Sequence, residues 1–258
     1  MEIIPEEVAA VVFDVDDTLL DNKRKSAEGS LHDRSQVEAV RTIGRRREID
    51  ELIYMTKEES YDAFLSAPEH TLQSGILNMF TRAGLLDKMG LEELKGLVEI
   101  VADLKDTLHE LILFEDGEAF DGAVDFVRGL SGQLGLVDKM AIASTSNRRD
   151  VDIFLGKVGL KDQFHNLSII TIENVERPKP DPEVFDKAFL SLGLPESDRA
   201  YTYALEDDPK GIRAAKEAGL RVIGMTTRFD REHLASQPVA PDFIADSFPE
   251  LSKRFGLK

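Results

Sequence analysis

Residues 8–19 read VAAVVFDVDDTL, and this stretch decides the fold class that the sequence predicts. Residues 8–15 form a short, nearly continuous apolar run, which is typical of a β-strand that is covered on both faces. Three carboxylates, those of Asp14, Asp16 and Asp17, lie where this strand ends. Ligands bind outside the carboxyl ends of the strands in open α/β sheets, so this acidic turn is a candidate site.

Four later runs have the same apolar character as this first strand. They lie at residues 139–144, 167–171, 200–205 and 221–225 (KMAIAS, LSIIT, AYTYAL and RVIGM). Amphipathic patterns predict helices at about 122–134, from about 149, at about 182–192, and from Pro209 to just before Gly219. Strands that alternate with helices predict an α/β protein with a Rossmann-like parallel sheet and helices on both faces.

Residues 22–114 break this alternation, because they contain no convincing strand. Apolar residues recur at helical spacing over 91–114, and further helical patterns cover 31–43, 48–65 and 72–82, with Gly44 as a predicted break. We expect about four helices that form an all-helical subdomain inserted after the first strand. The predicted division is a discontinuous core, residues 1–21 and 115–258, and an inserted subdomain, residues 22–114.

The composition excludes several classes of protein. The 258 residues include 32 Lys and Arg against 49 Asp and Glu, a formal net charge of −17, which argues against binding to nucleic acid or to an anionic membrane. Cysteine is absent, so disulfides and thiolate metal sites are excluded. Because the N-terminus is acidic and no apolar run reaches about 18 residues, we expect a soluble cytoplasmic protein, a monomer or weak dimer.

The acidic turn DVDDT predicts a metal site. Three carboxylates at one strand end repel each other unless a cation offsets their charge, and Mg²⁺ prefers such oxygen ligands. Asp14 could then attack an electrophile while Asp16 handles a proton. The alternative is a solvated acidic turn at the end of the strand.

Polar groups of complementary chemistry follow the next runs. Ser144, Thr145 and Asn147 can hold the oxygens of an anion, although such residues also form turns and helix N-caps. Lys179 lies between two prolines in RPKPDP, where a fixed ammonium suits a phosphate and a carboxylate nucleophile. A solvated loop is the alternative interpretation of this lysine.

A second acidic group follows the run at residues 200–205. Glu206, Asp207 and Asp208 suit the far side of a metal site. The alternative is that Asp208 caps the next helix, and both can hold because Asp207 and Asp208 need not share a role.

The order of these groups, an acid pair, a hydroxyl, a lysine and a second acid pair, resembles the haloacid dehalogenase superfamily of phosphohydrolases and phosphomutases. The four motifs are DVDDT, the Ser of IAST, the Lys of RPKPDPEVF and the EDD of ALEDDPKGIRAAKEAG. The resemblance covers about residues 2–20 and 117–258. The last stretch is similar to the sugar-phosphate phosphatase and β-phosphoglucomutase branch, whose helical cap lies between the first two motifs, as the insertion does here.

The resemblance implies a role for each matching residue. Asp14 would be the nucleophile and a Mg²⁺ ligand, and Asp16 the general acid/base, whose backbone carbonyl also binds the metal. Ser144 would hold the transferring phosphoryl group. Lys179 would neutralise that group together with Asp14.

The resemblance also implies that Asp207 completes the Mg²⁺ site, with Glu206 as a second contributor. Two neighbours depart from the common pattern of the family. Asp17 stands where many relatives have Gly, and Asp208 where many have Ser or Thr. Both add negative charge near the metal, and Asp208 either tightens metal binding or caps the following helix.

A basic tract at residues 41–48 bears on the substrate. Its GRRRE is similar to a Gly-x-x-Arg-Glu element in the cap of the phosphoglucomutases, which implies that Arg47 contacts a phosphate distal to the reacting one. A solvated basic helix start is the alternative. Thr145 and Asn147 are the other candidate substrate-binding residues.

The resemblance therefore implies a Mg²⁺-dependent phosphatase that acts through an aspartyl phosphate. Its substrate would be a small phosphorylated metabolite, and we expect a sugar phosphate. A phosphomutase of the β-phosphoglucomutase type is the first alternative. A non-catalytic binding protein on the same fold is the second.

Overall fold

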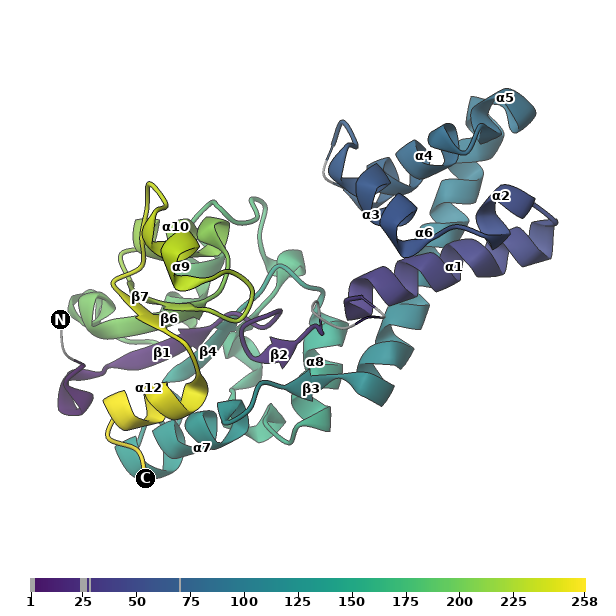
Figure 1. Ribbon diagram of the computed structural model, residues 1–258. Helices are drawn as coiled ribbons and strands as arrows, with labels where there is room; N and C mark the ends of the chain where they lie inside the picture. Colours follow the sequence, from purple (N-terminus) through teal and green to yellow (C-terminus); the bar gives the residue numbers. More distant parts are fainter. Residues whose placement is uncertain (1–2, 24–26, 28, 70) are drawn as a thin grey trace. The chain divides into compact units, whose positions relative to one another are not determined.

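The computed structural model describes residues 3–23, 27, 29–69 and 71–258. The chain forms two compact units (Figure 1). Met1–Asp21 and Gly117–Lys258 make up the core unit, and Asn22–Asp116 makes up the inserted unit. The core unit contains a six-stranded sheet flanked by helices, and the described residues of the inserted unit form helices only. The predicted α/β class is confirmed.

The core sheet contains the strands β1 (Ala10–Phe13), β4 (Met140–Ala143), β5 (Ile169–Ile170), β6 (Thr202–Glu206), β7 (Arg221–Met225) and β8 (Phe243–Ala245). Their order is β5-β4-β1-β6-β7-β8, and every neighbouring pair is parallel. β1 lies inside the sheet, where Val12 is in register with Ala141 and Ala204. All four residues of β1 are fully buried, which explains the continuous apolar run that predicted this strand.

Helices cover both faces of the core sheet. Successive residues of a strand point to opposite faces, so Val12 and Phe13 of β1 show what packs on each face. Val12 belongs to a buried cluster with Phe185 of α9 (Glu183–Ser191) and Ile212 of α10 (Pro209–Glu217). Phe13 lies on the other face, with its ring 6.4 Å from that of Phe126 in α7 (Ala123–Leu134). The Phe126 ring in turn lies 5.6 Å from that of Phe248 in α12 (Phe248–Arg254).

The remaining elements of the core unit are short. They are the helices α8 (Arg148–Lys157) and α11 (Arg231–Ala235), the ribbon strands β2 (Leu20–Asp21) and β3 (Glu118–Ala119), and the 3-10 turns Pro5–Glu7, Lys161–Gln163, Asn166–Ser168, Ile172–Asn174 and Glu196–Tyr201. β2 and β3 pair antiparallel where the chain leaves and re-enters the core unit, with Asp21 opposite Glu118. Neither this ribbon nor β8 was predicted, because none of these strands lies in an apolar run of the length that marked the other strands.

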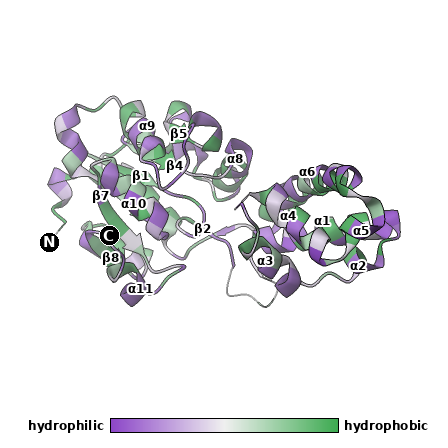
Figure 2. Ribbon diagram, turned by 90° about the horizontal axis from the view of Figure 1, so that it is seen from above, coloured by the Kyte–Doolittle hydropathy of each residue, from purple (hydrophilic) through white to green (hydrophobic). Residues whose placement is uncertain are grey.

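The inserted unit contains α1 (Leu31–Arg47), α2 (Asp50–Ile53), α3 (Lys57–Leu65), α4 (Leu72–Arg82), α5 (Leu85–Met89) and α6 (Leu91–Asp116). α6 has 26 residues, so it is about 39 Å long. Val40, Phe80 and Val101 are fully buried and join α1, α4 and α6 in one apolar cluster. Hydrophobic and hydrophilic residues alternate along the helices of both units, as expected for helices with one buried face (Figure 2).

Two predictions for the inserted unit were wrong. Residues 48–65 form two helices rather than one, because α2 ends at Ile53 and Thr56 begins α3 with a capping box to Glu59. Gly44 does not break α1 but lies buried inside it. A Cβ at Gly44 would lie 2.7 Å from the backbone nitrogen of Ile53, so the glycine permits α2 to pack closely.

None of the helices in the described part of the chain is both long enough and apolar enough to span a membrane.

Candidate active site

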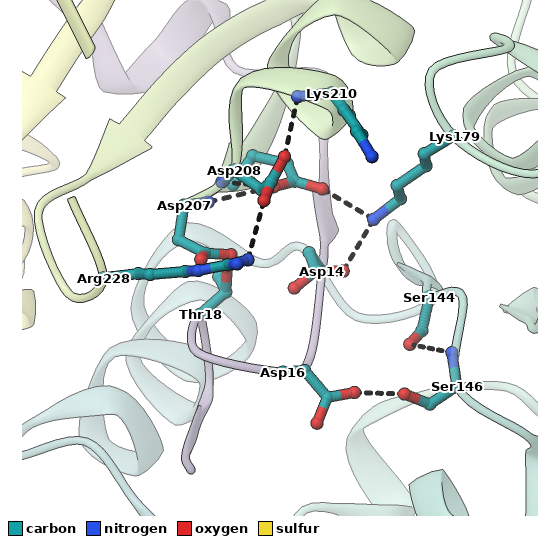
Figure 3. Close-up of polar contacts among 11 residues, drawn as sticks. Asp14, Asp16, Thr18, Ser144, Ser146, Lys179, Asp207, Asp208, Lys210 and Arg228 are labelled. Carbon is teal, nitrogen blue, oxygen red and sulfur yellow. Dashed lines mark hydrogen bonds and ion pairs between the residues drawn. The ribbon is translucent and has the colours of Figure 1, made fainter. Parts of the chain in front are cut away.

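Three adjacent strands bring the predicted residues to one edge of the core sheet. Asp14 follows β1, Ser144 follows β4 and Asp207 follows β6, so all three lie at the carboxyl edge (Figure 3). The backbone nitrogen of Asp14 donates to the carbonyl oxygen of Leu205 at 3.0 Å, which extends the sheet ladder to the first carboxylate. The backbone nitrogen of Ser144 donates to the carbonyl oxygen of Ile170 at 3.0 Å. Both side chains therefore start from rigid backbone.

Lys179 joins the two acidic groups. Its Nζ donates to Asp14 Oδ1 and to Glu206 Oε1, each at 2.6 Å. The side chain of Lys179 is only 7% exposed, and its Nζ lies 4.9 Å from the centre of the Phe185 ring. Burial lowers the pKa of Lys179, but Asp14 and Glu206 outweigh this effect and raise it above its ordinary value. The lysine is therefore a fixed positive charge at neutral pH.

Glu206 is held from three sides. Its Oε2 accepts the backbone N–H groups of Asp207 and Asp208, each at 3.0 Å, while Oε1 accepts Lys179. A Cβ at Gly211 would overlap the Glu206 carboxylate, so this close approach requires a glycine there. These contacts make Glu206 a positioning group for Lys179. Its predicted contribution to metal binding stays a prediction.

Asp207 has one carboxylate oxygen held and one without a partner. Oδ1 accepts the Thr18 hydroxyl at 3.1 Å, whereas Oδ2 is buried and has no hydrogen-bond partner among the described residues. Burial raises the pKa of Asp207 well above its ordinary value, and the charges of Glu206 and Asp14 add to that effect. A buried, ionised carboxylate with an unpartnered oxygen is costly in free energy unless a cation binds to it.

Asp14, Glu206 and Asp207 fit a divalent cation. Each offers a carboxylate oxygen, and these atoms lie within 4.8 Å of one another. Burial raises the pKa of Asp14 to about 8, against the lowering effect of Lys179 and with further increases from Glu206 and Asp16. One lysine thus leaves this cluster short of positive charge, and oxygen-rich, buried sites of this kind suit Mg²⁺.

Asp16 and Ser144 are linked through Ser146 (Figure 3). The Ser146 hydroxyl donates to the Asp16 carboxylate, and the Ser146 backbone nitrogen donates to Ser144 Oγ at 3.0 Å. Ser144 is buried and Asp16 is half-buried. No pattern in the sequence indicated the contact between Ser146 and Asp16.

The predicted substrate-binding residues Thr145 and Asn147 flank this group. Thr145 is exposed. Asn147 caps α8, because its Oδ1 accepts the backbone N–H of Asp150 at 2.8 Å and its Nδ2 donates to Asp150 Oδ2 at 2.9 Å. The N-cap alternative is therefore confirmed for Asn147. A role for either residue in substrate binding stays a prediction.

Arg47 lies in the inserted unit, in the exposed last turn of α1. The interpretation of its tract as a helix start was wrong, because Arg45, Arg46 and Arg47 end the helix. Cations are favoured there by the helix dipole. Contact between Arg47 and a distal phosphate stays a prediction.

The two departures from the family pattern have structural reasons. Asp17 is buried with φ 58°, a backbone conformation that Gly adopts freely and that Asp tolerates better than most residues. Asp208 caps α10, since its Oδ1 accepts the backbone N–H of Lys210 at 2.8 Å. Its Oδ2 accepts Arg228 Nη1 at 2.7 Å. The capping interpretation of Asp208 is confirmed.

A Rossmann-like core whose strand ends bring carboxylates and a buried lysine together defines a class of α/β hydrolytic enzymes. The sequence model of the haloacid dehalogenase-like hydrolases matches residues 8–219, which is most of the chain. The chain therefore belongs to the haloacid dehalogenase-like hydrolase family, as the sequence motifs predicted.

Two known proteins are similar to this chain over most of its length. Pyrophosphatase PpaX from Anoxybacillus flavithermus is 27% identical over 223 residues, which cover 81% of this chain and 95% of that protein. Protein SUPPRESSOR OF QUENCHING 1, chloroplastic, from Arabidopsis thaliana is 26% identical over 251 residues, which cover 95% of this chain. The chain spans only 20% of the length of that Arabidopsis protein.

Solved structures show the same fold. A family IA, variant 3 HAD hydrolase from Entamoeba histolytica has a TM-score of 0.68 at 22% identity. The similarity covers 96% of this chain and 97% of the Entamoeba chain.

Proposed function

We propose that this chain is a Mg²⁺-dependent phosphatase that acts on a small phosphorylated metabolite, a sugar phosphate, through an aspartyl phosphate on Asp14. The observation that carries the proposal is the position of Asp14, whose buried carboxylate is paired with Lys179 and lies beside oxygens of Glu206 and Asp207. Family membership and the relative named a pyrophosphatase support phosphatase chemistry. The likeness of residues 206–219 to the sugar-phosphate branch supports the substrate class.

The proposed reaction has two displacements at phosphorus. In the first, a carboxylate oxygen of Asp14 attacks the phosphorus, the bond to the leaving oxygen breaks, and Asp16 donates a proton to that oxygen. In the second, Asp16 takes a proton from water, and the water oxygen attacks the aspartyl phosphate. Inorganic phosphate leaves, and the Asp14 carboxylate is regenerated. The hydrogen bond from Ser146 orients Asp16 for both proton transfers.

Fixed charges supply most of the proposed rate acceleration. Lys179 is already held against Asp14 by Glu206, so it neutralises the nucleophile and the phosphoryl group without rearranging. Mg²⁺ held by Asp14 and Asp207 would add positive charge beside the phosphoryl oxygens. Ser144, at the end of β4, would hold a phosphoryl oxygen.

The direct test is hydrolysis of an aryl phosphate with and without Mg²⁺. We expect turnover that requires Mg²⁺ and that falls at least about a thousandfold in Asp14→Asn, because the amide is not a nucleophile. Asp125→Asn, on the exposed side of α7, is the matched control and should keep full turnover. Unchanged turnover in Asp14→Asn would contradict the nucleophile, and turnover in excess EDTA would contradict the cofactor.

A second assay distinguishes the proposed phosphatase from the two alternatives. With β-glucose 1-phosphate and a bisphosphate primer, a phosphomutase would form glucose 6-phosphate, whereas the proposed phosphatase releases inorganic phosphate. A binding protein would turn over no ester in a panel of sugar phosphates. Formation of glucose 6-phosphate, or no turnover of any ester, would contradict the proposal.

A further inference from the structure

Arg228 lies in the loop after β7 and is not part of the four motifs that carry the family resemblance. Its Nη1 donates to Asp208 Oδ2 at 2.7 Å, and its guanidinium carbon lies 4.9 Å from the centre of the Phe229 ring. Phe229 packs against the apolar cluster of the core unit and stacks on His233 with ring centres 4.4 Å apart. The guanidinium is therefore held in place by an ion pair and by a ring that is itself fixed.

The partner of Arg228 belongs to the catalytic loop. Asp208 follows Glu206 by two residues, so their Cα atoms are separated by at most about 7.6 Å. Glu206 in turn contacts Lys179, which is paired with Asp14. Figure 3 shows the Arg228 side chain extending from its loop to the carboxylate of Asp208. Arg228 is thus paired with the residue that follows Asp207, a member of the buried acidic cluster.

Arg228 still has hydrogen-bonding capacity. Among the described residues, Asp208 is the only acceptor for its guanidinium, which carries five N–H donors. The side chain is 34% exposed. A planar, preorganised guanidinium with exposed donors suits a carboxylate or a phosphate.

We propose that Arg228 binds a second anionic group of the substrate, a carboxylate or phosphate a few bonds from the reacting phosphate. This inference rests on the proposed function and narrows its substrate class to phosphate esters or anhydrides with such a second group. The competing explanation is that Arg228 only neutralises Asp208. If Arg228 only neutralises Asp208, the double variant Arg228→Gln/Asp208→Asn should recover the wild-type preference between substrates, whereas loss of a second anion site should persist in it.

The test compares two esters that differ only at the second group, glycerol 3-phosphate and 3-phosphoglycerate. In Arg228→Gln, the ratio of kcat/KM for 3-phosphoglycerate to that for glycerol 3-phosphate should fall at least tenfold. Arg231→Gln is the matched control, because Arg231 is an exposed arginine of the next helix that pairs with Asp246 at 3.0 Å. The control should keep the wild-type ratio. An unchanged ratio in Arg228→Gln, including an equal loss for both esters, overturns the inference.

A binding measurement separates this inference from the proposed function. In the presence of Mg²⁺, calorimetry with methylenediphosphonate and with inorganic phosphate needs no turnover. Arg228→Gln should weaken diphosphonate binding at least tenfold more than phosphate binding. If the wild type hydrolyses no ester but shows this difference, the proposed function fails and the second anion site stands. Equal weakening of both ligands overturns the site, whatever the activity.

Discussion

The two units of this chain use charged residues in opposite ways. In the core unit, Asp14, Lys179 and Glu206 are buried together at the carboxyl edge of the sheet, each at most 8% exposed in its side chain. In the inserted unit, charges lie at the surface, as in the pair of Lys95 and Glu92, with side-chain exposures of 54% and 87%. Buried charges cost free energy to desolvate, whereas surface charges contribute little either way. The core unit thus concentrates the free-energy cost of buried charge at one place, which is the proposed active site.

Replacing a lysine in each unit gives the largest expected contrast. Lys179→Met removes the cation that pairs with two buried carboxylates, so we expect a loss of about 3 kcal/mol in metal-free stability and loss of turnover. Lys95→Met should change stability by less than about 0.5 kcal/mol, because its ion pair is exposed. Urea unfolding in EDTA measures the stability of both variants. Equal losses in the two variants would contradict the contrast between the units.

A glycine in each unit gives the next contrast. Gly211→Ala would place a Cβ against the Glu206 carboxylate and displace the group that holds Lys179. We expect a loss of about 1–3 kcal/mol and at least a tenfold fall in turnover. Gly96 lies exposed inside α6 with no heavy atom within 4 Å of an added Cβ. Gly96→Ala should therefore stabilise the protein, by about 0.5–1 kcal/mol.

Thermal melts and steady-state turnover of both glycine variants test this contrast. A stable, fully active Gly211→Ala would show that Glu206 does not need its position. A destabilised Gly96→Ala would show that the surface of α6 is more constrained than its exposure indicates.

The last contrast concerns pH. The pKa of Asp14 is raised to about 8 in the folded protein, above its usual 3.8. Between these values the folded metal-free protein keeps a proton that the unfolded chain releases, so its stability falls as pH rises. The Tm of Asp14→Asn minus that of wild type should therefore increase by several degrees from pH 5 to pH 7.5 in EDTA.

The control for this measurement is Asp125→Asn, for which the same difference should not change with pH. Saturating Mg²⁺ should reduce the dependence in wild type, because a bound cation favours the ionised carboxylate. A difference for Asp14→Asn that is independent of pH would contradict the raised pKa.

Much of the fold could be predicted because the strands of the core sheet are buried on both faces. The run before Asp14 is apolar at nearly every position, and such runs need no partner to be recognised. Where burial is partial, prediction failed: β8 has three residues, of which only Ala245 is fully buried. The break expected at Gly44 was wrong because that glycine serves the packing of α2, which depends on residues distant from the local pattern.

The site shows the same division. Strand order along the chain is enough to predict that Asp14 and Asp207 meet at one edge. Which oxygen accepts which donor depends on side-chain packing, so the hold of Glu206 on Lys179 could not be predicted. Thr18 was visible within DVDDT, but its bond to Asp207 spans most of the chain. Arg228 carried no signal, because a lone arginine in a loop belongs to no periodic pattern.

The pairing of β2 with β3 holds the two ends of the inserted unit together. Asp21 and Glu118 are partners in one antiparallel ladder, so the points of departure and return are one strand spacing apart. To the ribbon of β2 and β3, Asn22–Asp116 is therefore the loop of a hairpin, and the free energy of closing a loop rises only slowly with its length. We therefore expect this junction to accept an insertion of a different length at little cost to the core unit.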